Sequence, residues 1–207
     1  MRRRGPSLAL VERSGCRLTG LDIQPEGIAH ANSLAAKRAL ANRATFAVVD
    51  CGGRLRLADS SFDAVLCMDS IGHLPDRFAA LSDWCRLLSK GGRLVFTDPV
   101  VLTGAVAKSE IDDRATLTSN VFFVPPGVNE EAIRAAGLTI LRCQDRASAV
   151  AEIASRWHAA RLQRSKHLLK EEGEEWFARR QRMLATAAEL ARSRRMSRFL
   201  YVAEKPS

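Results

Sequence analysis

The sequence lacks the features that would place a protein in a membrane or in an oxidising compartment. No apolar run in its 207 residues approaches the roughly 20 residues of a membrane helix, and no apolar core follows the N-terminal arginines as in a secretory signal. The five cysteines are odd in number and widely spaced, and none forms a C-x-x-C pair. This pattern predicts reduced thiols in a cytoplasmic protein, without a disulfide framework.

Motifs for metal-dependent or hydrolytic chemistry are also missing. The sequence contains no H-E-x-x-H, no paired cysteines and no carboxylate cluster, so we expect no metal site. It also contains no G-x-S-x-G, the turn that presents the nucleophile of many hydrolases. The sequence therefore gives no indication of a metal site or of a hydrolase.

Positive charge is concentrated late in the chain. The formal net charge is +9, and residues 142–198 carry 14 basic and 7 acidic side chains, an excess of +7. A solvated helical face explains such an excess more simply than a nucleic-acid site does. Few aromatic side chains for base stacking can be assigned there, so we do not expect nucleic acid as a partner.

Short apolar strands alternate with helical patterns along most of the chain. The expected strands are 16–23, 44–51, 62–69, 93–100, 138–145 and 197–205, and the expected helices are 25–42, 77–92 and 129–137. Gly91 and Gly92 are expected to end the second helix, and Asn129 to cap the start of the third. Residues 101–128 look irregular. This order predicts an α/β fold with an open, mostly parallel, Rossmann-like sheet.

Two long amphipathic helices are expected between residues 147 and 195. Trp157 and Trp176 lie on their apolar stripes, at helical spacing, which is typical of core or oligomer-surface residues. The sequence therefore divides into an α/β core at 1–146, an αα-hairpin at 147–195 and a last strand at 196–207 that returns to the sheet. The hairpin is expected either to take part in substrate selection or to form the surface of a homodimer.

Acidic residues end four of the expected strands. In open α/β sheets, ligands bind beyond the carboxyl ends of the strands. The residues at these ends are Asp22, Asp50 with Cys51, Asp69 with Ser70, and Asp98. Because aspartate favours turns, one such ending is uninformative. Asp22 and Asp50 together favour a nucleotide-like ligand, since one carboxylate can accept from ribose hydroxyls and the other from an adenine amino group.

At these residues the chain resembles the class I S-adenosylmethionine-dependent methyltransferase family. The resemblance is carried by TGLDIQPEGIAHAN, ATFAVVDC, LADSSFDAVLCMDSIGHLPDR and LSKGGRLVFTDP, whose order and spacing match from about residue 5 to residue 100. RFLYVAEKP resembles the final antiparallel strand of the family. The resemblance implies the strand order 3-2-1-4-5-7-6, with S-adenosylmethionine as cofactor and a small-molecule methyl acceptor.

The resemblance also implies roles for individual residues. Asp22 would bind the ribose and Ile23 would pack against the adenine, whose other contacts would come from Asp50 and Cys51. His73 is the candidate catalytic residue, at the mouth for the substrate. The full implied set of cofactor-binding residues is Gly5, Asp22, Ile23, Asp50, Cys51, Asp69 and Ser70, the last two beside the methionine moiety.

The chain departs from the family pattern at its start. The family opens its domain with a strand and a glycine-rich loop, D-x-G-x-G-x-G, whose glycines let the backbone approach the cofactor. Here Gly5 stands where that loop would finish, about 17 residues before Asp22. The comparison predicts that this chain starts inside its domain and lacks the first strand.

Two other classes of function remain open from the sequence alone. A nicotinamide-dependent oxidoreductase also places an acid after its second strand, and a non-catalytic interaction protein could use the basic hairpin. DSIGHLPD and the late antiparallel strand favour the methyltransferase over both.

Overall fold

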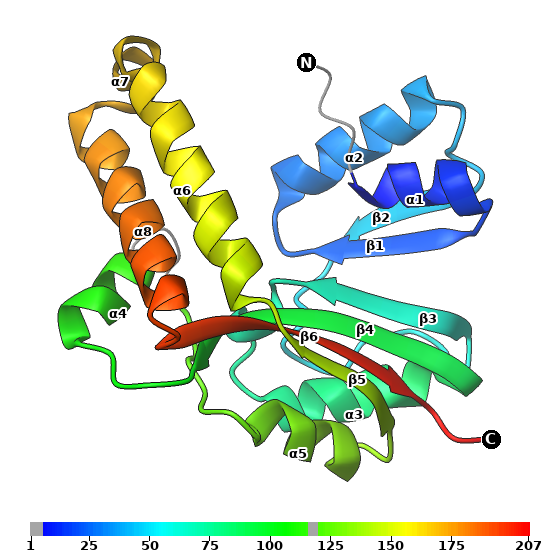
Figure 1. Ribbon diagram of the computed structural model, residues 1–207. Helices are drawn as coiled ribbons and strands as arrows, with labels where there is room; N and C mark the ends of the chain where they lie inside the picture. The colour runs from blue at the N-terminus through cyan, green and yellow to red at the C-terminus, as the bar shows by residue number, and fades with distance from the viewer. Residues whose placement is uncertain (1–5, 116–119) are drawn as a thin grey trace. The chain divides into compact units, whose positions relative to one another are not determined.

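The computed structural model describes residues 6–115 and 120–207 (Figure 1). The chain divides into two compact units, Met1–Leu55 and Arg56–Ser207. Gly5 lies outside the described residues, so its predicted place in a cofactor loop stays a prediction. Within the described ranges, no helix is both long enough and apolar enough to cross a membrane.

The first unit is a pair of parallel strands packed against two helices. Its elements are α1 (Pro6–Ser14), β1 (Leu18–Asp22), α2 (Pro25–Lys37) and β2 (Ala44–Val48). The two strands pair in register from Leu18 opposite Ala44 to Asp22 opposite Val48. Their core is a cluster of small and medium apolar residues: Leu8, Val11, Ala35, Leu40 and Ala44. Pro25 starts α2, as predicted, but α2 ends before residue 42 because Ala39 adopts a left-handed backbone with φ 54°.

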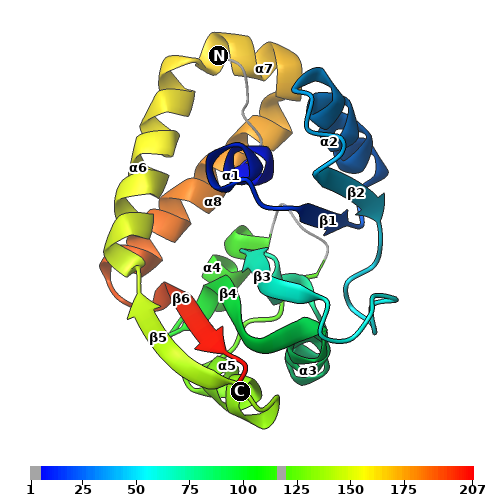
Figure 2. The same ribbon diagram turned by 90° about the vertical axis from the view of Figure 1, so that its right-hand side faces the viewer.

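The second unit is built on a four-stranded mixed sheet. Its elements are β3 (Phe62–Met68), the 3-10 turn η1 (Ile71–His73), α3 (Arg77–Leu87), β4 (Leu88–Leu102), α4 (Lys108–Ala115), α5 (Val128–Ala135), β5 (Thr139–Asp145), α6 (Ala147–Gln163), α7 (Ser165–Glu172), α8 (Glu174–Arg192) and β6 (Met196–Glu204). The strand order is β3-β4-β6-β5 (Figure 2). β3 and β4 are parallel, whereas β6 runs antiparallel to β4 and β5. In the core, Phe96 stacks on Tyr201 with ring centroids 4.7 Å apart.

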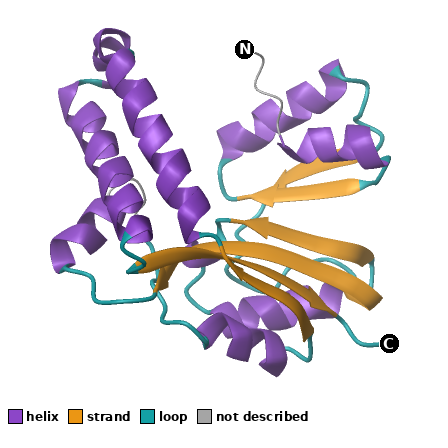
Figure 3. Ribbon diagram, in the orientation of Figure 1, coloured by secondary structure: helices purple, strands orange, loops and turns teal. Residues whose placement is uncertain are grey.

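The observed pairing confirms the α/β class and the antiparallel last strand (Figure 3). The implied order 3-2-1-4-5-7-6 contains both observed sheets: β2-β1 corresponds to 3-2, and β3-β4-β6-β5 corresponds to 4-5-7-6. No described strand occupies the position numbered 1. Whether the protein lacks that strand stays a prediction.

Several expected boundaries are wrong. The helix predicted to run to residue 92 ends at Leu87, because Leu88 is already extended and pairs with Phe62 in the sheet. Phe78, in the first turn of α3, is 41% exposed. Residues 101–128 are not wholly irregular, since they contain α4. Asn129 does not cap α5: Gly127 holds that position, and Asn129 is buried within the first turn.

The predicted helical hairpin is present, but the packing face of α6 differs from the expected one. α6 and α8 pack together through Ala154, Leu184, Ala187 and Ala188, with the short α7 between them in sequence (Figure 1). Trp157 is 64% exposed and Trp176 is exposed too, so neither belongs to the core. Alanines let the two helices approach closely, and this contact leaves the bulky residues of α6 on the outside.

Candidate functional site

Three of the predicted cofactor-binding residues gather at the carboxyl ends of β1 and β2. The two strands end side by side because they are parallel and in register, and the backbone N–H of Val49 donates to the carbonyl of Asp22 at 2.9 Å. Burial raises the pKa of the Cys51 thiol, and the negative charges of Asp50 and Asp22 raise it further. Both carboxylates are therefore close to Cys51.

The two carboxylates at this edge keep free hydrogen-bonding capacity. One oxygen of Asp22 accepts from the backbone N–H of Gln24 at 2.9 Å, and one oxygen of Asp50 accepts from that of Gly52 at 2.8 Å. Among the described residues, the second oxygen of each has no partner, and both side chains are exposed. Ile23, beside Asp22, leaves 60% of its surface exposed. An apolar side chain next to a free carboxylate fits a nucleoside. The base would pack on the apolar side chain, and the hydroxyls would donate to the carboxylate.

At the end of β3, Asp69 is tied to the next strand. Its backbone is left-handed, with φ 60°, which is uncommon outside glycine. The hydroxyl of Thr97 accepts from the Asp69 backbone N–H at 3.0 Å and donates to its carboxylate at 2.7 Å. Arg198 Nε, from β6, lies 2.8 Å from the same carboxylate oxygen. These contacts stabilise the strained turn that follows β3.

Ser70 and His73 follow Asp69 in the turn after β3, and both are exposed. The Ser70 hydroxyl lies 3.3 Å from the carbonyl of Met68. His73 Nδ1 lies 2.7 Å from the carbonyl of Asn120. Because a carbonyl can only accept, Nδ1 carries the proton, and Nε2 of the neutral ring is the acceptor. The geometry therefore gives His73 one nitrogen that can take a proton.

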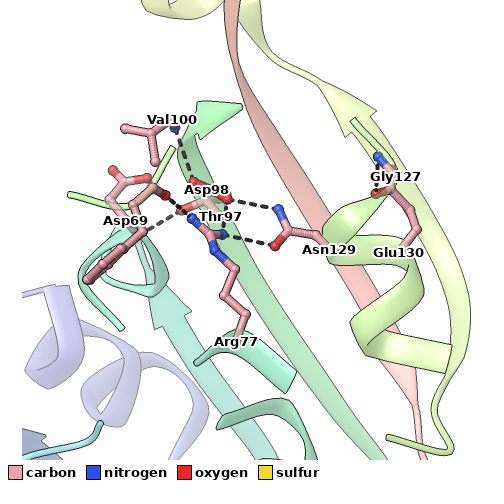
Figure 4. Close-up of polar contacts among 9 residues, drawn as sticks. Asp69, Arg77, Thr97, Asp98, Val100, Gly127, Asn129 and Glu130 are labelled. Carbon is pink, nitrogen blue, oxygen red and sulfur yellow. Dashed lines mark hydrogen bonds and ion pairs between the residues drawn. The ribbon is translucent and has the colours of Figure 1, made fainter. Parts of the chain in front are cut away.

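A buried polar network lies behind this turn (Figure 4). The carboxylate of Asp98 accepts from Arg77 and, at 2.8 Å, from the amide of Asn129. Its other oxygen accepts from the Val100 backbone N–H at 3.1 Å. All three side chains of the network are buried, and Asp98 is 0% exposed. Asp98 is therefore a structural residue, although the sequence placed it with the acids of the ligand edge.

The same network fixes the partner of His73. Arg77 donates to the carbonyl of Phe122 at 2.5 Å, and the Phe122 N–H donates to the carbonyl of Gly72 at 2.8 Å. These two bonds hold residues 120–122 beside η1, where Asn120 meets the His73 ring. The orientation of His73 thus depends on the buried ion pair of Arg77 and Asp98, which acts through the backbone of residues 120–122.

Sequence reasoning missed the residues that support the site. Arg77 stood at the start of an expected helix, Asn129 was taken for a cap, and Thr97 and Arg198 lay inside expected strands. The one available signal was the pair of Arg77 and Asp98, opposite charges at a helix start and a strand end. Nothing local indicated that Asn129 would join them, since it lies 31 positions from Asp98.

Comparison with solved structures identifies the fold. One solved structure of high similarity is that of a putative sarcosine dimethylglycine methyltransferase from Galdieria sulphuraria, with TM-score 0.86 and 21% identity over 98% of this chain and 74% of that one. Phosphoethanolamine N-methyltransferase 2 from Haemonchus contortus, in complex with S-adenosyl-L-methionine, has TM-score 0.87 and 20% identity over 98% and 46%. The fold is that of the class I methyltransferases.

Sequence matches cover the first half of the chain. Residues 4–96 match the model described as a methyltransferase domain. The chain is 31% identical to 27-O-demethylrifamycin SV methyltransferase from Amycolatopsis mediterranei over 93 residues, which are 45% of this chain and 34% of that protein. Sequence similarity to methyltransferases is thus established for residues 4–96. Its alignments span between 26% and 37% of the length of the first curated relatives.

Proposed function

We propose that this protein uses S-adenosylmethionine to methylate a small-molecule acceptor. The observation that carries the proposal is the end of β1, where Asp22 keeps one carboxylate oxygen free beside the exposed Ile23. These residues lie within the segment that matches the methyltransferase domain. The name of the relative from Amycolatopsis mediterranei supports a small-molecule acceptor.

The residues of the first unit would hold the nucleoside part of the cofactor. Asp22 would accept hydrogen bonds from the ribose hydroxyls, and Ile23 would cover one face of the adenine. Asp50 and Cys51 would meet the edge of the adenine, since the free oxygen of Asp50 can accept from an amino group. S-adenosylmethionine, when bound, supplies a methyl group that is activated by a positively charged sulfur.

The second unit would serve the acceptor. A methyl acceptor that carries a proton on its oxygen or nitrogen must lose it, and His73 would take that proton at Nε2. Asp69 and Ser70 would line the approach to the methionine moiety. Because methyl transfer depends mainly on alignment and on exclusion of water, the hydrogen bond that orients His73 matters as much as its basicity.

The wider organisation of the protein is also part of the proposal. We propose that 147–195 acts as a separate hairpin that selects the substrate, between a core at 1–146 and a returning strand at 196–207. A homodimer through this hairpin stays a prediction. The five free cysteines support a cytoplasmic location. Neither the oxidoreductase nor the interaction protein gains support from the matched family.

Calorimetric titration with nucleotides tests the proposal. We expect the protein to bind S-adenosylmethionine and S-adenosylhomocysteine saturably. At the same concentrations, we expect no saturable binding of NADH. Binding of NADH alone would favour the oxidoreductase. No binding of either compound would contradict the proposed function.

A further inference from the structure

Among the residues that the structure describes, Arg114 has no carboxylate partner, although its side chain is partly buried. Its side chain is partly buried in α4, and its Nε is fully buried without a hydrogen-bond partner. Its Nη1 donates only to the sulfur of Met183 at 3.3 Å, and a thioether is a weak acceptor. Within residues 6–115 and 120–207, no carboxylate lies within 4.0 Å of its guanidinium.

The acids of α4 are already engaged elsewhere. Glu110 pairs with Arg195 at 2.7 Å, and Asp112 with Lys108 at 2.6 Å. Asp113 accepts from the Thr186 hydroxyl at 2.9 Å and lies 3.8 Å from Arg182. The helix therefore pairs its negative charges and leaves Arg114 unpaired.

Asp69 is the carboxylate whose charge reaches Arg114, and it already has another cationic partner, Arg198. Burial lowers the pKa of Arg114, and the charge of Asp69 is close enough to raise it in part. Asp69, however, already pairs with Arg198 at 2.8 Å and accepts from Thr97. Two guanidinium groups thus compete for one carboxylate at the end of β3, and Asp98 is not available to them, because Arg77 and Asn129 occupy it.

A partly buried charge without a carboxylate partner is costly, and Arg114 lies close enough to the candidate site residue Asp69 to feel its charge. This arrangement points to a ligand that supplies the missing negative charge. We propose that Arg114 binds the anionic group, a carboxylate or a phosphate, of the methyl acceptor. This inference rests on the proposed function, and it narrows the acceptor from any small molecule to an acid.

Guanidinium is suited to this role, because its planar N–H groups can donate to two oxygens of one carboxylate or phosphate. Arg114, Asp69 and His73 all belong to the second unit, where the proton of the acceptor would be removed. The free carboxylates suited to a nucleoside belong to the first unit. For this reason we assign the unpaired cation to the acceptor and not to the cofactor.

Titration of the 207-residue protein with simple anions tests the assignment. Sodium phosphate and sodium benzoate serve as probes of the two anion types, against sodium chloride at matched ionic strength, followed by calorimetry and by thermal unfolding. We expect saturable binding of at least one probe. Arg114→Met should weaken that binding by at least about tenfold, and Arg114→Lys should retain part of it.

Arg93→Met is the matched control, because Arg93 is an exposed arginine of β4, outside the hairpin, whose ion pair with Glu204 is at 2.9 Å. It removes the same charge and should leave probe binding unchanged. Arg114→Met should melt at the wild-type temperature or above, since Arg114 loses no carboxylate partner. A purely structural arginine would lower the melting temperature and leave the probe affinity unchanged, which would overturn the proposal.

Two further results would overturn it. One is the absence of saturable binding of both probes to the wild-type protein. The other is displacement of the bound probe by S-adenosylhomocysteine, which would place Arg114 in the cofactor site. Because the probes are titrated without cofactor, a failure to bind S-adenosylmethionine leaves this test intact and counts only against the proposed function.

Discussion

Asp22 and Asp98 occupy the same pattern in the sequence, an apolar strand followed by an acid, yet the two units use them in opposite ways. In the first unit, Asp22 is exposed, and one oxygen of its carboxylate accepts from the backbone N–H of Gln24 in a local turn. In the second, Asp98 is fully buried and all its hydrogen bonds are made within the protein. Asp69 is intermediate, because it is exposed like Asp22 but is held by Thr97 and Arg198.

The difference comes from the elements that surround each acid. β1 ends at Asp22, so its carboxylate meets solvent. β4 continues past Asp98 to Leu102, and α3 and α5 bring Arg77 and Asn129 against it. An acid at a strand end thus marks the ligand edge of a sheet, and the neighbouring elements decide whether that acid can bind a ligand.

The largest expected effect comes from breaking the buried network. Arg77→Met should lower the free energy of unfolding by about 3–5 kcal/mol, because it leaves the charge of Asp98 buried without its partner. Urea unfolding measures this loss. Arg192→Met, which breaks an exposed ion pair with Glu189, should change stability by less than about 1 kcal/mol. If the two variants lost equal free energy of unfolding, Arg77 would not be the partner that stabilises the buried charge of Asp98.

The intermediate case, Asp69, should respond less. Thr97→Val keeps the shape of the side chain and removes both of its hydrogen bonds to Asp69. We expect a loss of about 1–3 kcal/mol in the same unfolding measurement, the range for hydrogen bonds to a charged group. A loss as large as that of Arg77→Met would place Asp69 with the buried acids and remove the distinction between them.

The smallest expected effect concerns the exposed acids. The charge of Asp50 raises the pKa of Cys51, so Asp50→Asn should lower that pKa and speed alkylation of Cys51 by iodoacetamide at pH 8. Mass spectrometry of the alkylated peptides measures the rate. Cys143 is the internal control, since its pKa of about 11 is set by its own burial and by Glu130. An unchanged rate at Cys51 would indicate that Asp50 does not lie beside the thiol.

The sequence predicts the strands and the exposed acids well because both are local patterns. An apolar run ending in an acid needs no distant partner to be recognised, and Asp22, Asp50 and Asp69 were located in this way. The family resemblance supplied the strand order, which periodicity alone does not contain. Both sheets agree with that order.

The rest depends on contacts between distant residues. α4, with the sequence KSEIDDRA, has no apolar stripe to reveal it, and its acids are held by Arg195 and Thr186 from later elements. Trp157 is exposed because α8 packs against Ala154 of α6 and not against Trp157. The counter-ions of Asp98 and the isolation of Arg114 are likewise visible only after folding.

The central claim is that Asp22 is available to a ligand, and calorimetric titration with S-adenosylhomocysteine tests it most directly. Asp22→Ala should weaken binding by about 1–3 kcal/mol, the loss of charge-assisted hydrogen bonds. Glu12→Ala, which removes an acid of α1 that pairs with Arg38 at 3.4 Å, should bind as the wild type does. Unchanged affinity of Asp22→Ala, in a protein that binds S-adenosylhomocysteine, would contradict the account.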